Sequence, residues 1–347
     1  MLRLVPMLRL VPMLRIAPML RIAPMLRIAP MLGLAVLLSL SATSQAQTGS
    51  ASRRPFTLIV PVAAGAANDL IARTLAAEVK DELGAVVVDN KPGGNGIVGA
   101  EQVRRAPPDG RTLLVAPSSY VIMAAMESAT PYDFARDFTA VINTANLPFY
   151  MVVNQEALPA KSLSELVQLL RARPGKISYG SAGNGSPHHF AAEMLKLRSG
   201  IDMLHVPYKG MAQGIPDLLE GRIQLVITGL PAVATQLKSG KLRVLATTES
   251  RRTTLNPDIP TFAEAGVPGV EMETWLGMVA PAGTPRAAID QANAAFNRAL
   301  KLPQVREKLA AQGLEVMGGT AETFNARIRS DIESFRKVSK AAGLKPD

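Results

Sequence analysis

The stretch from residue 178 to residue 200 reads SYGSAGNGSPHHFAAEMLKLRSG. It predicts a strand, a tight loop and a helix in succession, because Ser186 and Pro187 suit the N-cap and first positions of a helix. The first N–H groups of a helix lack internal partners and carry partial positive charge, so such a loop can hold a carboxylate without Lys or Arg. A turn whose glycines serve only steric needs is the alternative interpretation, and the stretch alone leaves both open.

Short β-rich segments alternate with helical patterns from Phe56 onward, which predicts a parallel α/β fold. The last part of the chain is largely helical, with long helices expected at 286–300 and 323–342. Trp275, the only tryptophan, falls in a long extended segment and is interpreted as core or hinge packing. The segments expected as strands are 56–60, 85–90, 112–115, 138–143, 148–154, 177–180, 203–206, 223–228, 243–248, 270–280 and 314–317.

The first 46 residues are expected to be a leader that is removed. Residues 1–30 repeat a six-residue unit that ends in proline, which suits neither a helix nor a solenoid. The short apolar run at 32–40 is followed by polar residues and by Ser44-Gln45-Ala46, the layout of a secretory signal with its cleavage site. A membrane anchor needs about twenty apolar residues, so this run is too short. The mature protein is expected to begin at Gln47 and to be exported.

Composition excludes several classes of protein. The leader holds five of the 38 Lys and Arg and no acid, which leaves 33 basic against 28 acidic groups and a net charge of +5. This modest excess is weak evidence for nucleic acid, and no nucleic-acid partner is expected. The chain has no Cys, which excludes disulfides, thiolate metal sites, Cys nucleophiles and a lipid-modified N-terminal Cys.

A glycine motif raises the possibility of a dinucleotide site. Gly94, Gly96 and Gly99 fit the pattern G-x-G-x-x-G. A dinucleotide site requires these glycines after the first strand and an acid at the end of the next one. Here they follow the second expected strand, and the strand expected at 112–115 leads into a segment without an acid. Nucleotide binding is therefore kept only as an alternative.

Hydrolysis is the other alternative. Ser181 or Ser186 would act with His188, His189 or His205, but no acid is placed to orient the base. The nucleophile elbow G-x-S-x-G is absent because position 179 is Tyr, and the adjacent histidines lack the spacing of a metal site. We therefore expect no catalytic residue, no metal and no cofactor.

Further short motifs occur in a fixed order along the mature chain. They are FTLIVP at 56–61, NDLIAR at 68–73, DNKPG at 89–93, PDG at 108–110, VPYKG at 206–210, PT with EAG at 260–266, and APAGTP at 280–285. Together they resemble the solute receptors of tripartite tricarboxylate transporters, also called the Bug family. The resemblance covers nearly the whole mature chain.

The resemblance implies a type II periplasmic binding protein whose two α/β lobes are joined by two crossover strands. It implies a monomer that closes on a small organic acid and delivers it to the membrane permease subunits of a tripartite tricarboxylate transporter. Lobe 1 is expected at 47–147 plus 278–347, and lobe 2 at 148–277, because the chain would cross at 148–154 and return at 270–280.

The resemblance also places the ligand between two loops, 62–69 and 181–186. Asp69 either only caps its helix or also faces the ligand, and Tyr208 offers either a hydrogen bond or a ring face. The first loop departs from the family, which often has consecutive glycines where this chain has Ala64-Gly65-Ala66-Ala67, so its methyl groups would narrow the pocket. The ligand-binding residues predicted are Ala63, Ala64, Gly65, Asn68, Asp69, Ser118, Ser181, Ala182, Gly183, Asn184, Gly185, Ser186, His189, Tyr208 and Thr228.

Overall fold

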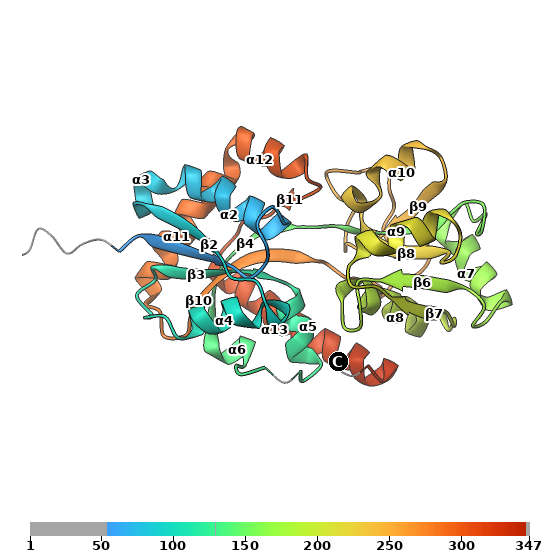
Figure 1. The fold of residues 1–347 in the computed structure, drawn as a ribbon, viewed down its shortest axis with the longest axis horizontal. Coiled ribbons are helices and arrows are strands. Elements are labelled where there is room, and N and C mark those ends of the chain that lie inside the picture. The colour runs from blue at the N-terminus through green and yellow to red at the C-terminus, as the bar shows by residue number, and fades with distance from the viewer. Residues whose placement is uncertain (1–53, 129, 345–347) are drawn as a thin grey trace, which may run out of the picture. The chain divides into compact units, whose positions relative to one another are not determined.

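A computed structural model describes residues 54–128 and 130–344 of the chain. The leader, signal sequence and cleavage site predicted within residues 1–46 lie outside these described residues. Residues from Arg54 onward form one unit that holds two β-sheets, each covered by helices on both faces (Figure 1).

The first sheet has six strands in the order β11-β4-β10-β3-β1-β2. Its strands are β1 (Phe56–Val60), β2 (Val86–Asn90), β3 (Thr112–Pro117), β4 (Phe138–Asn146), β10 (Trp275–Pro281) and β11 (Glu315–Val316). The helices that accompany it are α2 (Ala67–Glu78), α3 (Lys80–Leu83), η1 (Gly94–Gly96), α4 (Ile97–Arg104), α5 (Ser119–Ala125), α6 (Phe134–Asp137), α11 (Arg286–Lys301), α12 (Pro303–Ala310) and α13 (Ala321–Ala342).

The second sheet has five strands in the order β7-β6-β8-β5-β9. Its strands are β5 (Phe149–Asn154), β6 (Ser178–Ser181), β7 (Leu204–Pro207), β8 (Leu225–Gly229) and β9 (Leu242–Thr247). Its helices are α7 (Leu163–Ala172), α8 (Pro187–Ser199), α9 (Met211–Leu219), η2 (Leu230–Ala232) and α10 (Ala234–Lys238). We call the first sheet with its helices lobe 1 and the second lobe 2.

Both sheets are mixed rather than wholly parallel as the sequence predicted. In lobe 1, β1 pairs in parallel with β2 and β3, whereas β10 runs antiparallel to β3 and β4. In lobe 2, β6 pairs in parallel with β7 and β8, whereas β5 runs antiparallel to β8 and β9. The two-residue strand β11 at the edge of the first sheet also runs antiparallel, to β4. The reversed strands β5 and β10 are the first that the chain forms after each crossing between lobes. They enter from the side where the parallel strands end, so they must run the opposite way (Figure 1).

The chain crosses between the two sheets twice. The chain leaves the first sheet at Asn146 and enters the second at Phe149, and it returns between Thr247 and Trp275. All seven residues of β10 pair within the first sheet, so the boundary predicted at 277/278 falls inside this strand. The short helices α5 and α6 have no counterpart in the sequence prediction.

The hydrophobic core continues from one lobe to the other. One buried cluster contains residues of both lobes, including Phe138, Phe190 and Trp275. Helix α13 packs on α5 and β4 of its own lobe and also on α8 of lobe 2, where the rings of Phe335 and Phe190 lie 5.7 Å apart. The Trp275 side chain is fully buried and its indole N–H donates to Asp331, which confirms its predicted packing role.

A buried carboxylate lies where the two crossings meet. The Glu249 side chain is 5% exposed and accepts a hydrogen bond of 3.1 Å from the Asn146 amide at the end of β4. Arg327 of α13 donates to the other side of the same amide and pairs with Glu273 beside the return crossing. Burial, followed by the repulsion of Glu273, raises the pKa of Glu249 to about 8.

We expect Glu249→Gln to stabilise the protein in alkaline solution. Because the folded-state pKa lies above the ordinary value of 4.5, the wild type loses stability as the pH rises from about 4.5 to about 8. A neutral amide avoids this loss and keeps an acceptor for Asn146. Urea unfolding should show a gain of about 2 kcal/mol at pH 9 and little difference at pH 5. Glu271→Gln, at an exposed position, is the control, and an equal gain for both variants would contradict the assignment.

Candidate functional site

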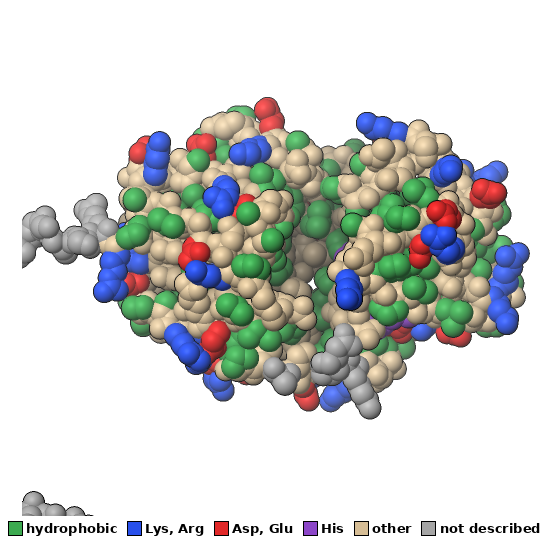
Figure 2. Space-filling view, in the orientation of Figure 1, with side chains coloured by type: hydrophobic (Ala, Val, Ile, Leu, Met, Phe, Trp, Pro, Cys, Tyr) green, Lys and Arg blue, Asp and Glu red, His purple; other side chains and the backbone are tan. Residues whose placement is uncertain are grey.

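A cavity of about 900 Å³ lies between the lobes. Five of the segments that line it follow the carboxyl ends of parallel strands, which is where α/β folds place their ligand sites. Helix α5 and the residues after it add Met123, Met126, Ser128 and Thr130 to the lining. Figure 2 shows the surface hollowed between the lobes. The five segments are 61–63 after β1, 92–97 after β2, 117–119 after β3, 182–187 after β6 and 208–209 after β7.

The walls of this cavity combine apolar side chains with exposed backbone. Ile97, Met123 and Met126 supply most of the bulk on the side of lobe 1. Among the described residues that line the cavity, Lys209 is the only one with a charged side chain, and no acid is present. The lining therefore favours an anionic or neutral solute with an apolar body.

The loop from Ser181 to Ser186 connects β6 to α8 as predicted. The Ser186 hydroxyl caps the helix by accepting from the His189 N–H at 3.3 Å, and Pro187 occupies the first turn. Gly183 and Gly185 have φ of 111° and 68°, values that side-chain-bearing residues rarely adopt. Glycine is therefore required at both positions by the backbone, whatever else the loop does.

Several N–H groups of this loop already have acceptors inside the protein. Gly183 donates to the Ser181 hydroxyl at 3.1 Å, Gly185 to the His189 imidazole at 3.2 Å, and Ser186 to the Gly183 carbonyl at 3.2 Å. The expectation that the amides from Ser181 to Ser186 are available together for a carboxylate is therefore too broad. The helix dipole still makes the start of α8 positive, because it does not depend on which amide is bonded.

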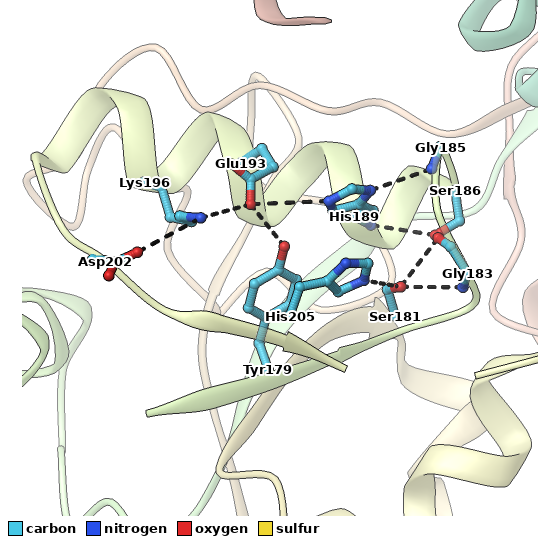
Figure 3. A network of polar contacts seen from close by, with 10 residues as sticks. All are labelled: Tyr179, Ser181, Gly183, Gly185, Ser186, His189, Glu193, Lys196, Asp202 and His205. Carbon is cyan, nitrogen blue, oxygen red and sulfur yellow. Dashed lines mark hydrogen bonds and ion pairs between the residues drawn. The ribbon is translucent and has the colours of Figure 1, made fainter. Parts of the chain in front are cut away.

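Beneath the loop lies a chain of polar contacts that includes two stacked imidazoles (Figure 3). The rings of His189 and His205 lie 3.9 Å apart, and the Tyr179 ring lies 4.9 Å from His205 and 6.4 Å from His189. Glu193 accepts from the Tyr179 hydroxyl at 2.8 Å and from Lys196 at 3.0 Å. Burial, followed by the neighbouring His189, lowers the pKa of His205 to about 4, so this ring is neutral at ordinary pH.

Ser181 and His205 are close enough to suggest a nucleophile and its base, with Oγ and Nε2 2.6 Å apart. However, Ser181 is fully buried, its hydroxyl is bonded to the Gly183 backbone, and neither residue lines the cavity. The nearest acid, Glu193, is bonded to Tyr179 and Lys196 and lies 3.9 Å from His189. The arrangement supports the loop and gives no solute access to the hydroxyl.

The first loop separates residues that face the cavity from residues that hold the loop. Ala63 lines the cavity, whereas Asn68 is buried and donates to the Val115 carbonyl at 3.0 Å. Asp69 is also buried and accepts from Gly65, Asn90 and Arg73. Burial pushes its pKa upward, but the hydrogen bonds from Arg73, Gly65 and Asn90 hold the pKa of Asp69 below its usual range. Of the two interpretations of Asp69, these contacts favour the structural one.

A second, smaller cavity of about 310 Å³ accounts for two more of the predicted residues. Gly65 and Thr228 line it together with His188, whose ring packs on Phe149 at 4.7 Å. Burial lowers the pKa of His188 to about 4. Nearby residues of the same two segments line different cavities. Ala63 and Pro187 line the larger one, whereas Gly65 and His188 line the smaller one.

Tyr208 contributes a ring face rather than a hydroxyl to the larger cavity. Its hydroxyl donates to Asp217 at 2.6 Å, and burial together with this bond raises the pKa of Tyr208 to about 12.

The predicted site residues therefore fall into three groups. Those that line the larger cavity are Ala63, Ala182, Gly183, Asn184, Gly185, Ser186 and Tyr208. Those that line the smaller one are Gly65 and Thr228. Those that line neither of these cavities are Ala64, Asn68, Asp69, Ser118, Ser181 and His189.

The wall formed by residues 92–97 was not predicted from the sequence. Gly93, Asn95 and Gly96 line the cavity, and the Tyr120 hydroxyl fixes the Gly96 carbonyl at 2.8 Å. Of the glycine pattern considered for a dinucleotide, Gly96 lines this cavity, whereas Gly94 and Gly99 do not. Asn95 between two glycines is the sequence feature that could have indicated this wall. Its left-handed φ of 51° is a conformation that Asn tolerates better than most residues.

Within residues 54–128 and 130–344, no helix has the length and apolar character to cross a membrane. In the same residues, no group of three His, Cys, Asp or Glu side chains is placed to hold a metal ion.

Two α/β lobes with a cavity at the ends of their strands define a solute-binding protein of the periplasmic type. The family model "Tripartite tricarboxylate transporter family receptor" matches residues 71–344. Protein BugT of Bordetella pertussis is 34% identical over 295 residues, which cover 84% of this chain and 90% of BugT.

Solved structures give the same result. The structure described as R. palustris Rpa4515 with adipate is 34% identical, covers 86% of this chain and 100% of that one, and has a TM-score of 0.71. MatC (Rpa3494) from Rhodopseudomonas palustris with bound malate is 29% identical, with coverage of 82% and 98% and a TM-score of 0.67. The chain belongs to the tripartite tricarboxylate transporter receptor family, which includes the Bug proteins. The predicted family and two-lobed fold are confirmed.

Proposed function

We propose that this protein captures a small dicarboxylate between its lobes and delivers it to the membrane permease of a tripartite tricarboxylate transporter. Family membership and the carboxylates adipate and malate in the related structures support this function. The observation that carries it is the cavity itself, which has the positive start of α8 and Lys209 in its described walls and no acid.

The loops 62–69 and 181–186 are proposed to hold the two ends of the solute. In the second loop, the start of α8 would attract one carboxylate. Ala63 of the first loop, together with the segment around Asn95 after β2, would contact the rest of the solute. Because the walls between these loops are formed by side chains such as Met123 and Met126, an aliphatic body is a better match than a heavily hydroxylated one.

A binding role is favoured over hydrolysis. Among the described contacts of the predicted nucleophiles and bases, only Ser181 and His205 form a nucleophile–base hydrogen bond, and Ser181 is fully buried. Of the glycine pattern considered for a nucleotide, Gly96 lines the solute cavity.

We also propose that the protein reaches the periplasm through a signal cleaved after Ala46, with Gln47 as the first mature residue. The short apolar run and the small residues at the cleavage site support this proposal. N-terminal sequencing of the exported protein should read Gln47 first, and an intact leader on the exported protein would contradict it.

Calorimetric titration of the protein from Gln47 onward tests the proposed function. We expect adipate to bind and malate to bind more weakly, because the cavity walls match an aliphatic chain. Adipamide, which has the same length but no charge, should bind at least tenfold more weakly, since a charge-assisted hydrogen bond contributes about 1.5–3 kcal/mol. Equal binding of adipate and adipamide would exclude a carboxylate site, and binding of none of a panel of organic acids would overturn the function.

The position of the carboxylate can be tested with variants of the same titration. Gly185→Val should weaken adipate binding by about ten- to a hundredfold, because φ of 68° is strained for Val and the added side chain meets Met126. Gly183→Val, at φ of 111°, should act similarly. Lys209→Ala should have a smaller effect, because Lys209 is exposed and its charge is screened.

Gly200→Val provides the matched control for these variants. Gly200 ends the same helix with φ of 61° and open space around it, so Val there imposes comparable strain far from the cavity. This variant should lose stability and keep its affinity. Abolished binding in Lys209→Ala, together with normal binding in the two loop variants, would show that the start of α8 does not hold the carboxylate.

A further inference from the structure

Two imidazoles are each connected to one glycine of the loop that faces the solute cavity. His189, in the first turn of α8, accepts a hydrogen bond from the Gly185 N–H at Nδ1, at 3.2 Å. His205, on β7, bonds the Ser181 hydroxyl, which in turn bonds both the N–H and the carbonyl of Gly183. Figure 3 shows the two rings next to each other, beside the loop that carries Gly183 and Gly185.

The contact with Gly185 fixes the protonation of His189. A nitrogen that accepts an N–H cannot carry a hydrogen, so in neutral His189 the proton resides on Nε2. This atom lies 3.9 Å from the Glu193 carboxylate, on the side away from the loop. The ring lies against His205 at 3.9 Å with an interplanar angle of only 12°, which restricts its rotation.

The charged and titratable groups around His189 come from four elements. Glu193 and Lys196 lie on α8 itself, Tyr179 on β6 and His205 on β7, and Asp202 follows α8 at 3.8 Å from Lys196. Of the acids among these groups, only Glu193 lies next to the stacked rings, and its carboxylate also accepts hydrogen bonds from Tyr179 and Lys196. A second proton on His189 would therefore have one shared carboxylate to neutralise it.

We propose that His189 is a positioning residue for solute capture, whose proton-free Nδ1 holds the Gly185 amide and thereby fixes the loop that faces the cavity. This inference rests on the proposed function, because one of its tests measures the binding of a solute. His189 lies below the loop and does not line the larger cavity, so it acts through Gly185. Protonation would place two donors opposite each other, at Nδ1 and at the Gly185 nitrogen, and would displace the loop. Solute affinity should therefore fall as the pH is lowered through the range in which imidazoles titrate.

Titrations with adipate at pH 8 and pH 6 test the proposal in three variants. His189→Asn puts a non-titrating amide oxygen near the position of Nδ1, so it should bind within about threefold of wild type at pH 8 and lose the pH effect that depends on the imidazole. His189→Leu has no acceptor and should bind about tenfold more weakly at both pH values. His188→Asn removes the neighbouring imidazole and should keep the pH slope of the wild type. Protonation of adipate itself affects all four proteins equally, so the difference between slopes isolates His189.

A second measurement separates this inference from the proposed function. The Gly185 amide resonance of the ligand-free protein should shift between pH 8 and pH 6 in the wild type and in His188→Asn, and should stay constant in His189→Asn. A Gly185 resonance that shifts equally in the wild type and in His189→Asn, or wild-type affinity in His189→Leu, would overturn the positioning role and leave the binding function intact. A shifting resonance without binding of any organic acid would instead count against the proposed function alone.

Discussion

The direction in which the chain crosses between lobes is the constraint on which the rest of the structure depends. Every parallel strand of both sheets ends toward the same gap, so β5 and β10, which begin there, must run against their neighbours. The loops after β1, β2, β3, β6 and β7 are thereby gathered around one cavity. The solute site is a consequence of this topology, since no single loop forms more than one wall.

The site is held in place by buried polar contacts that the solute never touches. The glycines of the loop before α8 need support because their backbone gains nothing from side-chain packing, and two imidazoles and a serine hydroxyl provide it. Hydrogen bonds buried in this way are stronger than in water, and each partner left without one is costly. At the opposite wall, Asp69 and Asn68 do the same for the first loop.

Much of the fold was readable from local sequence. The alternation of β-rich and helical segments and the sequence Ser186-Pro187 gave the strands and the start of α8, because these features depend on residues close in the chain. The family resemblance placed the two loops, and seven of the fifteen site residues predicted in this way line the larger cavity. Neither the local signals nor the resemblance gave the wall near Asn95, or showed that His189 lies beneath the loop, because those positions depend on contacts across the sheet.

The sequence by itself determined the family, the two-lobed α/β class and the small-residue loops, since each is written in short segments whose order and spacing are visible along the chain. Only the tertiary structure decided which residues of those loops face the solute and which hold the backbone. Asp69 and Ser181 look in sequence like ligand-binding residues, yet both are buried and bonded to nearby backbone. The physical reason is that a polar side chain at a strand end can turn toward the cavity or back toward an unpaired amide, and the neighbouring strands determine which partner is in reach.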